Sequence, residues 1–298
     1  MRSNTGGTPD RDPLLGTQDL EAHRSEAKAL QLGTAIYTYL WECPLEEAIE
    51  RCARFGFETL ELTTTPPFLW PAHFGPYERR RLRRRLLDAG VQIFSLNPTF
   101  LDLNIISLNP AIRAASVAEV KENVQLAADL DAEVVVLAAG RRHPLIPSPY
   151  QQAEEVAVEA IGECVSLAAE MGITIGIENV PGLFVSTGSQ IAHLVESIDS
   201  TNCRVVFDVA NAHMVEDPAS GLREVAPYLA LVHYCDTRKD AWAHLPVGMG
   251  EVDFAASTQV LREVGYTRPV ILETTYPEDP DGGIRSSIEE LAGLGLIL

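Results

Sequence analysis

Short apolar runs alternate with amphipathic helical segments through most of this 298-residue chain. A segment with helical periodicity follows each run, and the runs are apolar on both faces, which is typical of parallel strands covered by helices. Eight such strand–helix units predict an α/β fold with a single (β/α)8 TIM barrel over residues 31–298. The predicted strands are residues 32–37, 57–62, 91–96, 133–138, 173–178, 204–208, 229–234 and 269–274.

A doubly wound sheet is the alternative fold. Such sheets usually have fewer strands and often carry a glycine-rich turn after the first strand. Here the first predicted strand runs into residues 38–44, which contain no glycine. Residues 1–30 show little apolar periodicity, and we expect them to form a flexible N-terminal extension outside the barrel.

The chain is acidic, with 42 Asp and Glu against 23 Lys and Arg and a net charge of −19. Proteins that bind a nucleic-acid backbone usually present a basic face, so we expect no nucleic-acid partner. No run approaches the roughly 20 apolar residues of a membrane span, and residues 1–10 lack the apolar core of a secretory signal. The five cysteines contain no CxxC pair. We therefore expect a cytoplasmic protein without a membrane partner.

Four predicted strands in the second half of the chain end near an acidic or imidazole side chain: Glu178, Asp208, His233 and Glu273. Any one of them alone is compatible with an ordinary loop residue or a helix cap. Function in TIM barrels lies at the C-terminal ends of the strands, however, and these residues occupy that position in four consecutive units. Three carboxylates and one imidazole predict a site for one divalent ion, Mn²⁺ ahead of Mg²⁺, Co²⁺ or Zn²⁺.

Segments around these residues resemble the sugar phosphate isomerase/epimerase superfamily, the xylose isomerase-like TIM barrels. This group includes ketose 3-epimerases, hydroxypyruvate isomerase, inosose dehydratase and endonuclease IV. The resemblance covers residues 31–298, and its most specific part is a His-x-Pro-x-Gly-x-Gly pattern after the seventh strand. The matching segments are Ile-Glu-Asn-Val-Pro-Gly (177–182), Phe-Asp-Val-Ala-Asn-Ala-His (207–213), Val-His-Tyr-Cys-Asp (232–236), His-Leu-Pro-Val-Gly-Met-Gly-Glu-Val-Asp-Phe (244–254) and Ile-Leu-Glu-Thr (271–274).

The resemblance implies that Glu178, Asp208, His233 and Glu273 are the metal ligands of a mononuclear enzyme, and that Glu178 and Glu273 also move protons on opposite faces of the substrate. It implies an isomerase or epimerase of a ketose, cyclitol or related polyol. Such an enzyme abstracts a proton next to a carbonyl and forms a metal-stabilised enediolate. A metal-dependent lyase or dehydratase is the alternative, and a non-catalytic binding barrel fits the same fold.

Two positions depart from the three-zinc pattern of endonuclease IV-type members. Asn211 stands three residues after Asp208, where that pattern has a histidine. The Asp-x-His pair of the pattern reads Trp242-Ala-His244 in this chain. Together with the net charge, these departures disfavour a three-metal phosphodiesterase.

Other polar residues near the predicted strand ends are candidate substrate contacts. Glu61 ends the second strand, where many members of the family place a substrate-binding acid, and His244 lies in a loop over the predicted barrel mouth. Each of these residues also has a simpler interpretation as a solvated loop residue or a helix cap. Because related barrels are commonly homo-oligomers, we also expect self-association. The candidate contacts with a small polyol substrate are Glu61, His143, Asn211, His213, Arg238 and His244.

Overall fold

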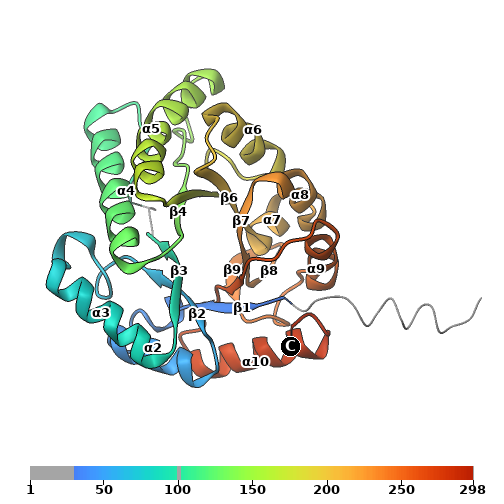
Figure 1. Ribbon diagram of the computed structural model, residues 1–298. Coiled ribbons are helices and arrows are strands. Elements are labelled where there is room, and N and C mark those ends of the chain that lie inside the picture. Colours follow the sequence, from blue (N-terminus) through green and yellow to red (C-terminus); the bar gives the residue numbers. More distant parts are fainter. Residues whose placement is uncertain (1–29, 99–101, 298) are drawn as a thin grey trace, which may run out of the picture.

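The computed structural model describes residues 30–98 and 102–297, and its strands form a closed parallel barrel surrounded by helices (Figure 1). This arrangement confirms the predicted (β/α)8 barrel. The predicted N-terminal extension lies outside the described residues, except for Leu30, which forms a parallel bridge with Ile297. In their order around the barrel, the strands are β1 (Leu32–Ala35), β10 (Val270–Leu272), β7 (Leu229–Tyr234), β6 (Cys203–Asp208), β5 (Thr174–Glu178), β4 (Val134–Ala138), β3 (Gln92–Asn97) and β2 (Thr59–Thr63).

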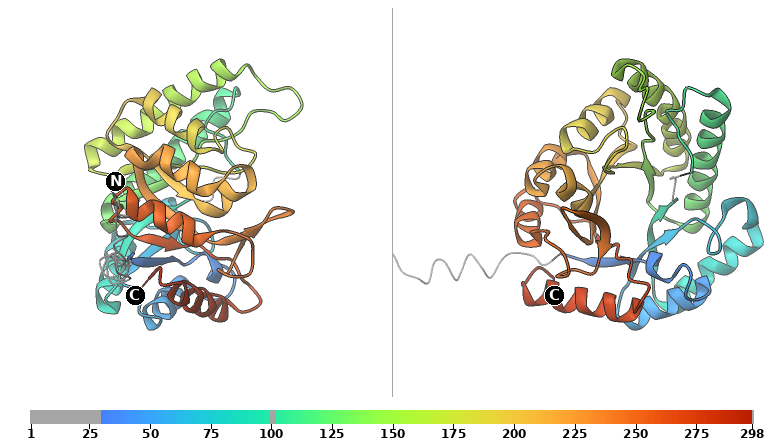
Figure 2. Two further views of the ribbon diagram at one scale, coloured as in Figure 1. Left: turned by 90° about the vertical axis from the view of Figure 1, so that its right-hand side faces the viewer. Right: turned by 180° about the vertical axis from the view of Figure 1, so that it is seen from behind.

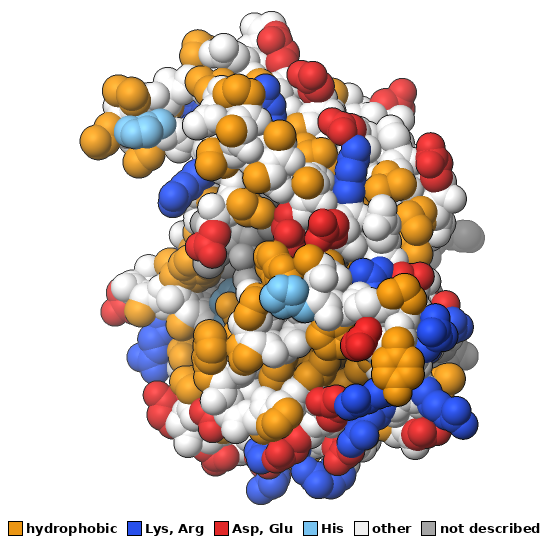
Figure 3. All heavy atoms as spheres, turned by 90° about the vertical axis from the view of Figure 1, so that its left-hand side faces the viewer, with side chains coloured by type: hydrophobic (Ala, Val, Ile, Leu, Met, Phe, Trp, Pro, Cys, Tyr) orange, Lys and Arg blue, Asp and Glu red, His pale blue; other side chains and the backbone are white. Residues whose placement is uncertain are grey.

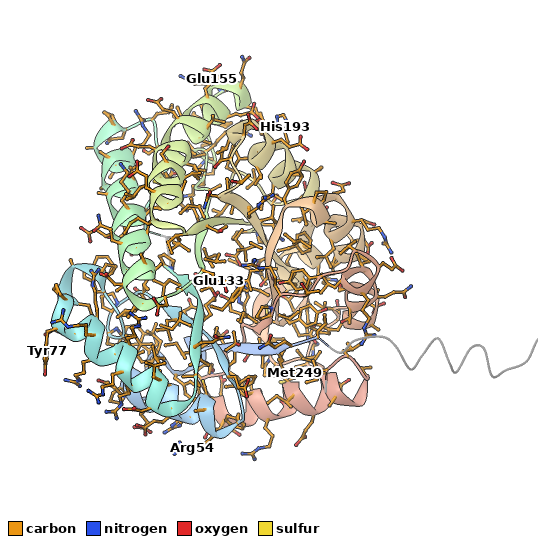
Figure 4. All side chains as sticks on the ribbon, in the orientation of Figure 1. Arg54, Tyr77, Glu133, Glu155, His193 and Met249 are labelled. Carbon is orange, nitrogen blue, oxygen red and sulfur yellow. The ribbon has the colours of Figure 1, made fainter. Side chains whose placement is uncertain are left out.

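The helices form an outer ring, and the labelled side chains of Tyr77, Glu155 and His193 lie on its rim (Figure 4). No helix among the described residues is both long and apolar enough to cross a bilayer. The helices are α2 (Leu45–Arg54), α3 (Pro76–Ala89), α4 (Pro110–Leu130), α5 (Tyr150–Met171), α6 (Gly188–Ile198), α7 (Val209–Val215), α8 (Pro218–Val225), α9 (Phe254–Glu263) and α10 (Pro280–Gly293).

A helix and a hairpin were not anticipated from the sequence. Helix α7 begins directly after β6, because the Asp208 side chain accepts the backbone N–H of Asn211 and caps the helix. Strands β8 (Asp236–Arg238) and β9 (Ala241–Leu245) form an antiparallel hairpin after β7. This hairpin and the loop between β4 and α5 project from the same end of the barrel (Figure 2, left). They flank the end at which the predicted site residues lie.

Small residues and branched apolar side chains fill the barrel interior. A Cβ atom on Gly176 would stand 2.5 Å from Val206 Cγ2, and one on Gly33 would stand 2.6 Å from Ile271 Cδ1. Both glycines therefore leave room for a large inward-facing neighbour. The interior cluster consists of Ala35, Phe94, Val134, Val136, Val206, Ala230, Leu231 and Ile271. This packed layer closes the barrel below the site.

One buried carboxylate holds the loop between β9 and α9. Asp236 is 2% exposed, and its side chain accepts the backbone N–H groups of Thr237, Gly248, Gly250 and Val252 at 2.8–3.0 Å. A Cβ atom on Gly250 would collide with Asp236 and with the Thr237 backbone. The Gly-x-Gly pattern of this segment is thus explained by close packing of the loop on a carboxylate.

Replacement of Asp236 by Asn should destabilise the protein. The Asn side chain has one acceptor oxygen, and its NH2 group would face two of the backbone N–H donors. We expect a loss of about 2–4 kcal/mol in the free energy of unfolding, since hydrogen bonds to charged groups are the stronger ones. Urea denaturation measures the loss. The matched control is Asp240→Asn in the exposed hairpin turn, and an equal effect of both substitutions would contradict this role of Asp236.

Candidate active site

The four predicted metal ligands point into the barrel because successive residues of a strand face opposite sides. Each ligand stands two positions after an inward-facing residue, so the ligands form the next layer toward the C-terminal end. The backbone N–H of Glu273, just past β10, still bonds to the Tyr234 carbonyl, which keeps this residue in the barrel wall. The pairs are Gly176 and Glu178, Val206 and Asp208, Leu231 and His233, and Ile271 and Glu273.

The four side chains converge on one point. Glu178, Asp208, His233 and Glu273 each offer one ligand atom, and these atoms lie within 4.8 Å of one another. His233 Nδ1 is 3.1 Å from Glu178 Oε1 and 3.2 Å from Glu273 Oε2. All four residues are buried, with exposed fractions of 8% or less.

Burial and neighbouring charges strongly perturb the ionisation of these groups. Burial raises the pKa of Glu178 to about 7 and also raises the pKa of Asp208. Burial by itself would lower the pKa of His233, but the carboxylates of Glu61 and Glu273 raise it well above the usual value. Burial would likewise raise the pKa of Glu273, but the neighbouring His233 lowers it below its usual range. The two glutamates therefore have opposite shifts in one site.

The donor set fits a divalent cation. Glu273 Oε2 and both ring nitrogens of His244 are buried and make no hydrogen bond of regular geometry with the described residues. The imidazoles of His233 and His244 lie 3.2 and 3.3 Å from Glu273 Oε2. Buried carboxylate oxygens normally have hydrogen-bond or cation partners, because an isolated buried charge is costly. Carboxylate oxygens with one imidazole nitrogen suit Mn²⁺, Mg²⁺, Co²⁺ or Zn²⁺.

A cavity of about 270 Å³ opens beside this cluster, at the C-terminal end of the strands. Figure 3 shows a recess on the left edge of the molecule. Glu178 and Glu273 line the cavity and so face both the cluster and the space for a ligand. The rest of the lining is largely apolar. The lining residues are Tyr37, Asn97, Pro98, Val136, Ala138, Glu178, Val180, Asn211, Trp242, Ala243, His244, Glu273 and Thr275.

Of the predicted substrate contacts, Asn211 and His244 line the cavity. His244 Nδ1 lies 3.3 Å from Glu273 Oε2, and the carboxylates around this histidine, Glu273 first, raise its pKa to about 9 against the lowering effect of burial. The Asn211 side-chain oxygen accepts a hydrogen bond from Trp242 Nε1 at 2.8 Å. Asn211 and Trp242 are the two positions that depart from the three-zinc pattern, and they are hydrogen-bonded to each other. This bond engages the side-chain oxygen of Asn211.

The other predicted contacts lie outside the cavity lining. His143 is exposed and accepts two backbone N–H groups of its own loop. Arg238 is exposed and donates to the Met249 carbonyl, and His213 Nε2 lies 3.9 Å from Glu251. Glu61 is fully buried behind His233, with its Oε2 atom 3.1 Å from His233 Nε2.

Two residues of the site were absent from the predicted set. Asn97, at the end of β3, donates hydrogen bonds to Glu61 and Glu273. Cys235 donates to Asp208 at 3.3 Å, and it joins Asp208, His244 and Glu273 in a second group of converging ligand atoms. Their positions in the sequence could have identified both residues. Asn97 is polar at a strand end, and Cys235 directly follows β7 two residues after His233.

Comparison with known proteins places the chain in a family. Residues 49–294 match the xylose isomerase-like TIM barrel family, and the chain belongs to it. An uncharacterized protein of Methanocaldococcus jannaschii is 26% identical over 256 residues, which are 84% of this chain and 85% of that protein. The L-ribulose 3-epimerase of Mesorhizobium japonicum is 24% identical over 258 residues, 83% and 82% of the two chains. A solved D-tagatose 3-epimerase-like protein superposes with a TM-score of 0.78 at 24% identity, over 89% of this chain and 98% of that one. The resemblance seen in the sequence is confirmed.

We expect the purified protein to bind about one divalent ion per chain, as a mononuclear four-ligand site would. Asp208→Asn should abolish this binding because it removes one of the four charged or imidazole ligands. Mass spectrometry of metal content after dialysis against Mn²⁺ and then buffer measures the effect.

The matched control is Asp217→Asn. Asp217 also caps a helix, α8, through Ser220, but it is exposed and outside the cluster. Metal retained at the wild-type level by Asp208→Asn, or about three ions per chain in the wild type, would contradict a mononuclear site at this quartet.

Proposed function

We propose that this chain is a divalent-metal-dependent epimerase or isomerase of an unphosphorylated ketose, cyclitol or related polyol. The observation that carries the proposal is the position of Glu178 and Glu273. Both carboxylates belong to the cluster of potential metal ligands, and both line the cavity beside it. The similarity to a sugar epimerase over most of the chain supports the same reaction class.

Glu178, Asp208, His233 and Glu273 would hold the ion. When bound, a divalent ion polarises a substrate carbonyl and stabilises the negative charge that develops on oxygen as a neighbouring C–H loses its proton. The protein's own contribution is the placement of two carboxylates that exchange protons with the substrate.

Glu178 and Glu273 come from separate parts of the barrel wall. Strands β6 and β7 lie between β5, which carries Glu178, and β10, which precedes Glu273. Their carboxylates approach the same His233 nitrogen. A substrate carbon held between two such carboxylates can lose its proton to one and regain a proton from the other, which inverts that carbon.

The cavity lining supports an uncharged substrate. Of the lining residues in the part of the chain that the structure describes, none is Lys or Arg. The two basic residues that follow His233 most closely are engaged elsewhere, since Arg238 donates to the Met249 carbonyl and Lys239 to the His213 carbonyl. Among the described lining residues, a phosphate group would therefore find no Lys or Arg to bind it, while the carboxylates of Glu178 and Glu273 would repel it.

Substitution of either glutamate should stop proton exchange. We expect Glu178→Gln and Glu273→Gln each to abolish incorporation of solvent deuterium into a ketose, because an amide cannot act as general acid or base at neutral pH. The assay incubates the Mn²⁺-loaded protein in D2O with a panel that includes L-ribulose and unphosphorylated ketohexoses, and NMR locates the deuterium.

The matched control is Glu133→Gln. Glu133 (labelled in Figure 4) precedes β4, so it lies at the opposite end of the barrel from the cluster, and it forms a solvent-exposed ion pair with Arg268. Full exchange in either active-site variant would overturn the acid–base assignment. Wild-type exchange that survives complete removal of metal by chelation would overturn metal dependence. A dehydrated product would show that the enzyme is a lyase.

A further inference from the structure

Glu61 is a fully buried carboxylate that the proposed reaction does not use. It lies at the inward-facing side of β2 and outside the cavity lining. Three donors surround its two oxygens. Ser95 Oγ is 2.7 Å and His233 Nε2 is 3.1 Å from Oε2, while Asn97 Nδ2 is 2.9 Å from Oε1. These contacts leave the carboxylate little capacity for a substrate hydroxyl.

The two ring nitrogens of His233 face different partners. Nδ1 points toward Glu178 and Glu273, where the ion would lie, and Nε2 points toward Glu61. A neutral imidazole carries one N–H and one lone pair, so a metal-binding Nδ1 requires the proton on Nε2. Glu61 is the carboxylate in position to accept that N–H.

We propose that Glu61 is a positioning residue that accepts the Nε2–H of His233 and directs the Nδ1 lone pair toward the ion. The inference rests on the proposed function where it concerns the ion. A carboxylate behind a metal-bound histidine fixes the tautomer and ring orientation and strengthens the histidine as a ligand. This role accounts for a charged group deep in the barrel, which would otherwise be costly to bury.

Asn97 extends the arrangement to a second ligand. Its Nδ2 group donates to Glu61 Oε1 at 2.9 Å and to Glu273 Oε1 at 2.8 Å. The same amide therefore fixes the orientation of Glu61 and engages the Glu273 oxygen that points away from His233. Strands β2 and β3 carry none of the four proposed ligands. Through Glu61 and Asn97, however, they contact two of them, His233 and Glu273.

The test measures binding of Mn²⁺ alone to the full chain by isothermal titration calorimetry. Glu61→Gln keeps the shape of the side chain but removes its charge, and its NH2 group must face either Asn97 or the Ser95–His233 pair. We expect the dissociation constant for Mn²⁺ to rise about 10–100-fold. The matched control is Thr64→Val, three residues after Glu61. This substitution removes a different buried hydrogen bond, from Thr64 Oγ1 to Asn123 Oδ1 (2.6 Å).

An unchanged dissociation constant in Glu61→Gln would overturn the proposal, as would an equal weakening in both variants, because that would indicate general destabilisation. A second readout separates this inference from the proposed function. In the metal-free protein labelled with ¹⁵N-histidine, Glu61→Gln should shift the Nε2 signal of His233, whereas Thr64→Val should not. If the wild type binds no ion, the proposed function fails, while the Nε2 signal still decides whether Glu61 holds that proton; an unshifted signal overturns the inference.

Discussion

Buried negative charge at the C-terminal end of the barrel is the constraint on which the rest of the site depends. Four carboxylates are enclosed there: Glu61, Glu178, Asp208 and Glu273. Among the described residues, their possible positive partners are the imidazoles of His233 and His244. Ionised carboxylates at such distances repel one another strongly in a poorly solvated interior. Burial raises the pKa of Glu178, and the neighbouring carboxylate of Glu273 adds to this rise. A divalent cation at the proposed site would offset the charge that neighbouring protein groups leave uncompensated.

The scaffold tolerates this cluster because its stability comes from elsewhere. The apolar layer at Val206, Leu231 and Ile271 closes the barrel directly below the ligands, and the main core lies between the strands and the surrounding helices. The loop after the hairpin is held by Asp236 through backbone N–H groups and not by the site residues. Buried polar groups at the site can therefore lack hydrogen-bond or cation partners without loss of the fold, which is common at functional sites.

The cavity combines two kinds of surface. Its polar lining includes Glu178, Glu273 and Asn97, and apolar residues such as Val136, Val180 and Trp242 form much of the remaining wall. Polar groups of this kind orient a ligand, while apolar and aromatic surface contacts its C–H faces. The hydrogen bond between Trp242 and Asn211 joins the hairpin to α7 across this wall. It adds a side-chain hydrogen bond between two elements that follow the neighbouring strands β6 and β7.

The sequence alone determined the eightfold alternation of strands and helices and the four residues at consecutive strand ends, because hydrophobic periodicity and position along a strand are local properties. It did not reveal α7, whose cap Asp208 is also a predicted ligand, nor the hairpin, whose strands are short and partly polar. Only the tertiary structure decided that Glu61 meets His233 across the barrel, that Asn97 joins Glu61 to Glu273, and that Cys235 contacts Asp208. These contacts join residues distant in the chain, and they depend on how the barrel closes, which no local pattern records.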